Sequence, residues 1–237
     1  MANKTLLDGK VSFTTHALPI GQDVITANYS GDSNYGFSSA TLTERVLAAN
    51  TTLALTSSPN PSFVGQAVKF VATITSNSGT PADGETITFG NDTRIYATAP
   101  LKAGTASIDI TSIPVGTPTI KATYSGDNTF DTSSASLKQV VNRYATSTRV
   151  TSNANPSPLG TVVTFTATVT GSGSTTPTGW VTFKDGTTVI GAQLLNAGKA
   201  KLTLSSLSKG QHSIVASYHA TTTWKSSTSP ILIQIVE

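Results

Sequence analysis

The chain has 237 residues, a net charge of +3 and only 11% charged residues, against about 25% in typical soluble proteins. The Lys and Arg residues are scattered, so no nucleic-acid interface is predicted, and the absence of Cys excludes disulfides and Cys-based metal or catalytic sites. No apolar run approaches the roughly 20 residues of a membrane span, and the first ten residues lack the apolar core of a signal peptide. For a surface protein, we therefore expect the export signal and the anchor to lie outside this chain.

Internal repeats divide the chain into three copies of one pattern. Separated positions match in the same order at an offset of 95 residues, which falls to 94 further along the chain. The matches include Tyr29-Ser30-Gly31-Asp32 with Tyr124-Ser125-Gly126-Asp127, Asn60-Pro61-Ser62 with Asn155-Pro156-Ser157, Phe89 with Phe183, and Tyr124 with Tyr218. We interpret residues 1–46 as the C-terminal half of a repeat, the first copy. Residues 49–142 and 144–237 are the full second and third copies.

Within each copy, apolar residues recur at every second position, which predicts β-strands. In chain order, the strands are indicated by Val11 with Phe13, Ile25 to Tyr29, Val68 to Ile74, Ile87 with Phe89, Ala106 to Ile110, Ile120 to Tyr124, Val140-Val141, Val163 to Val169, and Val181 with Phe183. Turn residues such as Ser78-Gly79-Thr80-Pro81 separate them, and no stretch has a helical stripe. About seven short strands per copy predict an all-β fold of tandem immunoglobulin-like β-sandwiches.

Several segments are similar to those of a known family. The segment Val181-Thr182-Phe183-Lys184-Asp185-Gly186, the stretch from Gly198 to Tyr218 and the Tyr-Ser-Gly-Asp turn resemble bacterial Ig-like repeat domains over nearly the whole chain. The resemblance implies rigid stalk or adhesive modules of secreted or surface proteins, and some related domains decorate phage virions. The third copy departs from the pattern, because His219-Ala220-Thr221 replaces Ser-Gly-Asp.

The repeated turn contains residues with two interpretations. Asp32 and Asp127 could ligate calcium, or they could accept hydrogen bonds from backbone N–H groups beside a glycine with positive φ. Calcium takes about six to eight oxygen ligands, whereas each turn offers a single Asp, so we predict a structural turn and no metal site. Tyr29, Tyr124 and Tyr218 are predicted to lie at the core edge, where each hydroxyl holds a neighbouring strand.

Histidine chemistry is sparse. His16, His212 and His219 occupy different repeat positions and lack the spacing of a zinc site. A Ser-His-Asp triad needs no fixed sequence order and stays open, but the chain has neither a Gly-x-Ser-x-Gly elbow nor a glycine-rich phosphate loop. We predict no cofactor and no enzymatic activity.

Trp180 and Trp224 are the two candidate aromatic contacts for a ligand, and both lie in the third copy. Trp224 aligns with Phe130, which favours packing at the edge of the core, whereas Trp180 directly precedes a predicted strand. The exposure of these two rings distinguishes a carbohydrate-binding module from a purely structural one.

The first copy contains only the back half of a sandwich. We expect residues 5–46 to form three strands, and three strands with one apolar face cannot bury that face alone. We therefore expect the face to pack against chain that does not belong to residues 47–237, from upstream sequence or from a partner.

These observations predict a structural and interaction protein: an extended string of Ig-like modules in an extracellular fibre, cell-surface adhesin, stalk or virion appendage. The predicted partners are neighbouring modules or other fibre subunits, with surface glycans as a further class, and the predicted location is extracellular or on the cell surface. The alternatives are a carbohydrate-binding module and an accessory domain of a secreted hydrolase.

Overall fold

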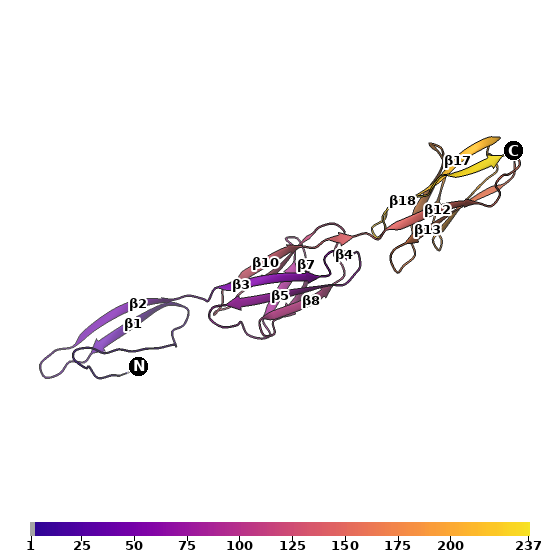
Figure 1. Cartoon of the computed structure of the whole chain (residues 1–237). Coiled ribbons are helices and arrows are strands. Elements are labelled where there is room, and N and C mark those ends of the chain that lie inside the picture. The colour runs from indigo at the N-terminus through magenta and orange to yellow at the C-terminus, as the bar shows by residue number, and fades with distance from the viewer. Residues whose placement is uncertain (1–2) are drawn as a thin grey trace. The chain divides into compact units, whose positions relative to one another are not determined.

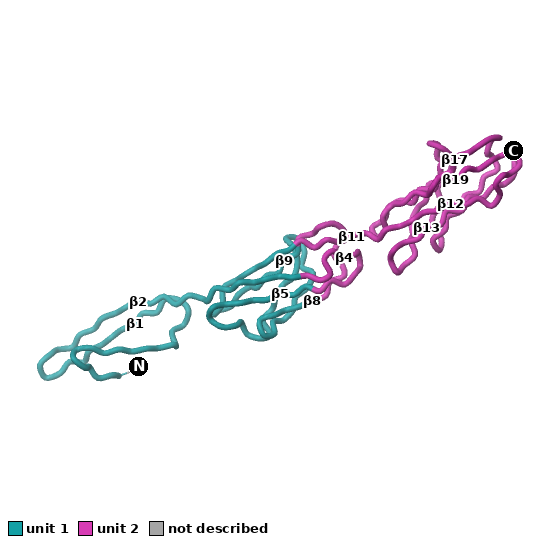
Figure 2. The backbone as a smooth tube through the Cα atoms, viewed as in Figure 1, with its two compact units in different colours: residues 1–56, 70–108, 120–137 teal, residues 57–69, 109–119, 138–237 magenta. Residues whose placement is uncertain are grey.

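The computed structural model describes residues 3–237, which form strands β1 to β19 and no helix (Figure 1). The all-β prediction of tandem Ig-like sandwiches is confirmed. The chain divides into two compact units (Figure 2). Unit 1 consists of Met1–Thr56, Phe70–Ile108 and Ile120–Leu137, and unit 2 consists of Ser57–Lys69, Asp109–Thr119 and Lys138–Glu237.

Most residues of two sheets of the second copy belong to unit 1. The strands are β3 (Thr51–Ser58), β5 (Val68–Ser76), β6 (Thr86–Gly90), β7 (Ile95–Pro100), β8 (Thr105–Ile110), β9 (Thr119–Tyr124) and β10 (Ser133–Lys138). One sheet has the order β10-β9-β6-β7 and the other has the order β3-β5-β8. Phe70, Phe89 and Ile120 are fully buried, as the alternation of apolar and polar residues predicts.

The first copy, also in unit 1, forms one antiparallel hairpin of β1 (Gly21–Tyr29) and β2 (Ser38–Val46) (Figure 1). In its register, Ile25 lies opposite Leu42. The prediction of three strands is wrong, because residues 11–20 form no strand. Residues 10–15 align with β8, which lies beside β5 in the second copy. The first copy has no counterpart of β5, so this segment lacks the hydrogen-bonding partner that would make it a strand.

Unit 2 contains a short parallel pair from the second copy, β4 (Ser62–Phe63) with β11 (Val141–Asn142), and the whole third copy. The strands of the third copy are β12 (Thr146–Ser152), β13 (Val163–Gly171), β14 (Trp180–Asp185), β15 (Thr188–Leu194), β16 (Lys199–Leu204), β17 (Gly210–Tyr218), β18 (Ser227–Thr228) and β19 (Leu232–Val236). One sheet has the order β12-β13-β16, and the other has the order β15-β14-β17 with β18 and β19 both paired to β17.

The third copy packs its core at the positions that its repeat predicts. Phe165, Phe183 and Ile214 are fully buried in one apolar cluster that also includes Trp224. Phe165 is the repeat counterpart of the buried Phe70 in unit 1. Within residues 3–237, the structure contains no helix with the length and apolar character needed to cross a membrane.

Candidate functional site

The second and the last strands of the second copy, β4 and β11, run in parallel and are joined by backbone hydrogen bonds. The N–H of Ser62 donates to the carbonyl of Val140 at 2.9 Å, and the N–H of Val64 donates to that of Asn142 at 2.9 Å. Short parallel ladders of this kind bring the beginning and the end of one module together. We call the bonded segments, residues 59–64 and 138–142, the terminal clasp of the second copy.

Two side chains reinforce this clasp. The side-chain amide of Asn60 donates to the carbonyl of Lys138 at 2.9 Å and accepts from the N–H of Val140 at 3.0 Å. Gln139 is fully buried, and its Nε2 donates to the carbonyl of Pro59 at 3.0 Å and to Ser62 Oγ at 3.1 Å. Both side chains therefore bridge the two segments that the backbone already pairs.

The third copy has the same clasp at residues 154–159 and 233–237. Asn155 donates to the carbonyl of Ile233 at 2.7 Å and accepts from the N–H of Ile235 at 2.9 Å. The buried Gln234 donates to the carbonyl of Ala154 at 2.8 Å and to Ser157 Oγ at 3.2 Å. The repeated Asn-Pro-Ser segment is visible in the sequence, but the two glutamines were not predicted as functional residues.

A second parallel contact holds the residue at which each full copy begins. Ala49 forms a parallel bridge with Phe130, and Tyr144 forms one with Trp224. In the third copy, the N–H of Tyr144 donates to the carbonyl of Thr223 at 3.0 Å. In each full copy, the N-terminal segment therefore pairs in parallel with later segments at two places, once at Ala49 or Tyr144 and once at the terminal clasp.

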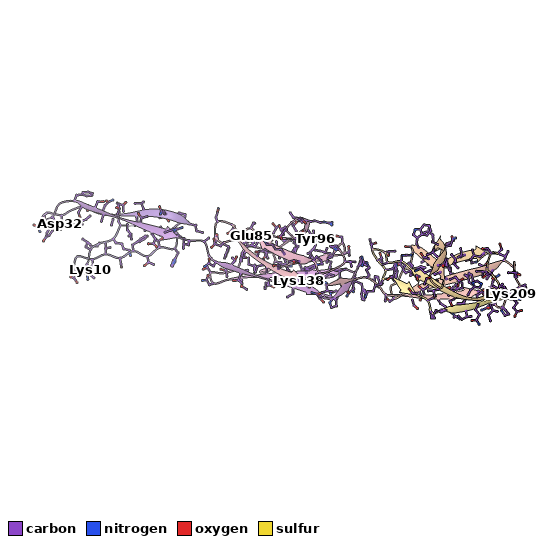
Figure 3. The ribbon with its side chains drawn as sticks, turned by 90° about the horizontal axis from the view of Figure 1, so that it is seen from above. Lys10, Asp32, Glu85, Tyr96, Lys138 and Lys209 are labelled. Atoms are coloured by element: carbon purple, nitrogen blue, oxygen red, sulfur yellow. The ribbon has the colours of Figure 1, made fainter. Side chains whose placement is uncertain are left out.

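The Tyr-Ser-Gly-Asp turns are held by backbone hydrogen bonds. Asp127 Oδ1 accepts from the N–H groups of Thr129 at 2.6 Å and Phe130 at 2.7 Å. Asp32, at the tip of the β1–β2 hairpin (Figure 3), accepts from Asn34 at 2.7 Å and Tyr35 at 2.9 Å. The Asn34 bond first, then the Tyr29 hydroxyl and the Tyr35 bond, hold the pKa of Asp32 below its usual value. The carboxylates thus have the geometry of turn-forming side chains.

In the third copy, Thr221 takes the place of this aspartate. Its Oγ1 accepts from the N–H groups of Thr223 at 3.2 Å and Trp224 at 3.0 Å. A neutral hydroxyl therefore holds the turn that a carboxylate holds elsewhere. Within residues 3–237, no three His, Asp or Glu side chains gather in a group that could hold a metal ion.

The repeated tyrosines have different hydroxyl partners. The hydroxyl of Tyr124 donates to Glu85 Oε2, and that of Tyr218 donates to the carbonyl of Thr178 at 2.7 Å. Both partners lie just before the strand that pairs with the tyrosine strand, β6 in one copy and β14 in the other. The hydroxyl of Tyr29 instead donates to Asp32 at 2.8 Å, within its own hairpin.

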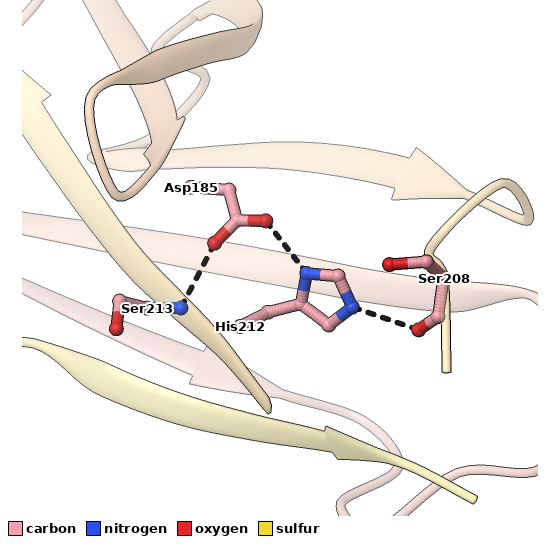
Figure 4. A network of polar contacts seen from close by, with 4 residues as sticks. All are labelled: Asp185, Ser208, His212 and Ser213. Atoms are coloured by element: carbon pink, nitrogen blue, oxygen red, sulfur yellow. Dashed lines mark hydrogen bonds and ion pairs between the residues drawn. The ribbon is translucent and has the colours of Figure 1, made fainter. Parts of the chain in front are cut away.

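The structure brings His212 together with two residues that the sequence did not connect to it (Figure 4). His212 Nδ1 lies 2.6 Å from Asp185 Oδ2, and its Nε2 lies 2.8 Å from the backbone carbonyl of Ser208. The other carboxylate oxygen of Asp185 accepts from the N–H of Ser213 at 2.9 Å. A Ser-His-Asp triad requires a serine hydroxyl at the imidazole. Ser208 presents its carbonyl oxygen, so this arrangement ties β14 to β17 and does not activate a nucleophile.

The two tryptophans differ in exposure. Trp224 is only 3% exposed and lies against Tyr144, with ring centroids 5.5 Å apart. A Cβ at Gly171 would overlap the Trp224 ring, so this glycine leaves the space that the larger ring occupies. Trp180 is 52% exposed and lies opposite Leu194, which is 56% exposed. Close to it, Thr182 Oγ1 lies 2.7 Å from His219 Nε2.

Several solved structures are similar to the chain at low sequence identity. Solved structures that resemble the chain include the Clostridium thermocellum CbhA fibronectin(III)-like modules, with 18% identity, 77% of this chain and 92% of that chain covered, and a TM-score of 0.33. Titin domains A168–A170 match with 10% identity, 80% and 66% coverage and a TM-score of 0.41. The D0-D1 domain of intimin matches with 15% identity, 77% and 97% coverage and a TM-score of 0.30. No curated protein matches the chain.

The sequence profile of one family matches twice. The profile described as bacterial Ig-like domain (group 3) covers residues 55–142 and residues 150–237, which lie within the second and third copies. The two matches together span well over half of the chain. The tandem sandwiches, their shared core positions and this match lead to one conclusion: the chain belongs to the bacterial Ig-like domain (group 3) family.

Proposed function

We propose that the chain is a load-bearing spacer of an extracellular fibre, stalk or adhesin. This is a finer role within the structural and interaction function that tandem bacterial Ig-like domains serve. Domains of this family are commonly extracellular, which supports placing the spacer outside the cell. In a virion appendage or a secreted enzyme, the modules would have the same mechanical task.

The observation that carries the proposal is the terminal clasp of each full copy. Tension on a module pulls its first and last segments in opposite directions. Because β4 and β11 run in parallel, this pull acts along the strands and loads all of their hydrogen bonds together. The third copy has the same arrangement, in which Ser157 pairs in parallel with Val236. Resistance to forced unfolding is set by the unfolding rate, which such bonds slow when they break in the first step.

The test is single-molecule extension of the chain held by its two ends. We expect two unfolding events, one for each full copy, and a lower unfolding force for one of them in the double variant Asn60→Ala and Gln139→Ala. The matched control is Asn91→Ala, because Asn91 caps the β6–β7 turn by accepting from Thr93 at 3.1 Å and Arg94 at 2.8 Å, away from the clasp. If the control lowers the force as much as the clasp variant for the same loss of thermal stability, the clasp has no special mechanical role.

The location has a separate test. Antibodies against residues 144–237 should label intact, unpermeabilised cells or particles of the source, and protease added outside should remove the label. Labelling that appears only after permeabilisation contradicts the proposed location.

A carbohydrate-binding module is the second candidate function, and the exposure of Trp180 favours it. Sugar rings stack on exposed aromatic faces, and Thr182 and His219 supply polar groups near Trp180, whose carbonyl accepts from the N–H of His219 at 3.0 Å. A panel of neutral oligosaccharides should then change the fluorescence of Trp180. The variant Trp180→Ala should abolish binding, whereas Trp180→Phe should retain part of it. Binding that survives Trp180→Ala excludes this platform.

A further inference from the structure

The first copy exposes positions that the second copy buries. At an offset of 95 residues, apolar residues that are open in one copy match residues that are enclosed in the other. The pairs are Leu6 (43% exposed) with Leu101 (2%), Val11 (54%) with Ala106 (2%), and Tyr35 (70%) with Phe130 (7%). The first copy has therefore kept the apolar pattern of a sandwich interior without the strands that cover it in the other copies.

The turn at Leu7–Lys10, which precedes the segment that aligns with β8, has the same conformation as in the full copies. Leu7 pairs with Lys10 as Lys102 pairs with Thr105, and the φ angles of Asp8 and Gly9 are 49° and 76°, against 48° and 73° at Ala103 and Gly104. In the full copies, this turn contacts the strand that lies beside it. Gly104 O accepts from the N–H of Ile74, and Gly198 O accepts from the N–H of Val169.

The space beside Gly9, which a neighbouring strand occupies at Gly104 and Gly198, is empty. A Cβ at Gly104 would lie 3.1 Å from Ile74 O, and one at Gly198 would lie 3.1 Å from Val169 O, whereas nothing lies within 4 Å at Gly9. The hydrogen bonds of the repeated tyrosines differ in the same way. We call the part of a copy before this turn, which in the second copy contains β3 to β7, its front half. The hydroxyls of Tyr124 and Tyr218 donate to residues in the front half of their own copy, whereas that of Tyr29 donates within its own hairpin.

We infer that residues 6–46 are an acceptor for the front half of another group 3 bacterial Ig-like module. The occupant has strands equivalent to β3, β5, β6 and β7, and its β7-like strand ends beside the Leu7–Lys10 turn, as β7 ends beside the matching turn in the second copy. It completes a sandwich on the uncovered face of β1 and β2. Residues 6–46 lie outside both terminal clasps, so this acceptor role is independent of the proposed mechanical role.

The rest of the chain has no vacant front half to lend. Phe70 and Phe89 in the second copy, and Phe165 and Phe183 in the third, are all fully buried. If the front half of the second or third copy moved onto residues 6–46, the back half of that copy would lose its own cover. An exchange of front halves between identical chains would therefore leave as many uncovered back halves as before. A front half from an additional module would cover residues 6–46 without uncovering another copy.

The test supplies such a segment to the chain. Residues 49–100 replace residues 1–5 directly before Leu6, which restores the repeat register because Leu101 aligns with Leu6. Amide hydrogen exchange is then read at residues 11–29, whose sequence occurs once in the fusion. We expect exchange to slow by about 100-fold relative to the unmodified chain, because these amides become part of a cooperative sandwich.

The controls separate completion of the sandwich from other effects. The same fusion carrying Phe70→Asp in the added segment alone should leave residues 11–29 in fast exchange, while residues 106–124 stay protected. Fast exchange in the unaltered fusion overturns the inference. So does strong protection of residues 11–29 in a monomeric, unmodified chain. Protection that increases with the concentration of the unmodified chain also overturns it, because the occupant is then a second copy.

Discussion

His212 and Asp185 form a partly buried hydrogen-bonded pair, with Nδ1 and Oδ2 2.6 Å apart. On the other side of the ring, Nε2 faces the carbonyl of Ser208 at 2.8 Å. Both neighbours are acceptors, so only the protonated imidazole, which donates from both nitrogens, satisfies them together. These two hydrogen bonds, the Ser208 bond first, raise the pKa of His212 above its usual value.

We therefore expect the third copy to lose stability as the pH rises. The contribution of His212 is complete below about pH 6.5, the usual pKa in the unfolded chain, and is lost as the pH rises through the raised pKa of the folded state. The expected loss is about 1 kcal/mol, and His212→Gln should remove this pH dependence. Both tryptophans lie in the third copy, so denaturant unfolding followed by tryptophan fluorescence reads this copy alone. The control is His219→Gln, at an exposed histidine. A pH dependence that persists in His212→Gln contradicts the assignment.

The turn at Thr221 predicts that one substitution stabilises the protein. Asp127 accepts its two backbone N–H groups at 2.6 and 2.7 Å, whereas Thr221 accepts the matching groups at 3.2 and 3.0 Å. A carboxylate makes stronger hydrogen bonds than a hydroxyl, so Thr221→Asp should raise the stability of the third copy by about 0.5–1 kcal/mol at neutral pH. Thr221→Val, which removes the acceptor, should lower it by about 1 kcal/mol. Denaturant unfolding by tryptophan fluorescence measures both changes, and a less stable Thr221→Asp protein would show that the turn cannot accommodate the charge.

The two tryptophans should differ in their importance for folding. Trp224→Ala removes a buried ring and should cost about 3–5 kcal/mol. Trp180→Ala changes an exposed side chain, and its effect should stay within about 0.5 kcal/mol. Each variant retains the other tryptophan as the fluorescent reporter of unfolding. Equal costs for the two variants would contradict the difference in burial.

Gly126 is expected to tolerate alanine poorly. Its φ is +73°, and an added Cβ would lie 2.8 Å from the carbonyl oxygen of Phe130. Gly65 is the matched control, because its φ is +77° but nothing lies within 4 Å. We expect Gly65→Ala to cost about 1 kcal/mol from backbone strain and Gly126→Ala to cost about 3 kcal/mol or more, because the turn must also shift. Hydrogen exchange across residues 68–124 measures the stability of both variants. Similar losses of stability in the two variants would show that the turn at Gly126 adapts to the added Cβ without further cost.

Much of this architecture follows from the sequence because the causes are local and repeated. Alternating apolar residues in segments such as Val68–Ile74 predict strands, since successive side chains of a strand point to opposite faces. The repeat offset predicts which positions share a role, and the burial of both Phe70 and Phe165 agrees with it. Glycines with positive φ, such as Gly31 and Gly126, appear in the sequence as turn residues.

Contacts between distant segments could not be predicted in this way. The Gln139 amide reaches Pro59 across 80 residues, and a buried glutamine has no periodic signature. The Asp185–His212 pair spans 27 residues and has no counterpart in the second copy, so the repeat gives no indication of it. The expected strand through Val11 and Phe13 failed for a related reason, because a strand requires a partner and alternation within one segment does not supply it.

The all-β class, the repeat and the apolar positions can be predicted from the sequence, because each depends on the spacing of side chains along one segment. Only the folded structure shows which strands pair, that β4 and β11 are clasped in parallel, and that Trp224 is enclosed while Trp180 is open. Each of these depends on hydrogen bonds and packing between segments tens of residues apart, whose geometry is set by the assembled sheets.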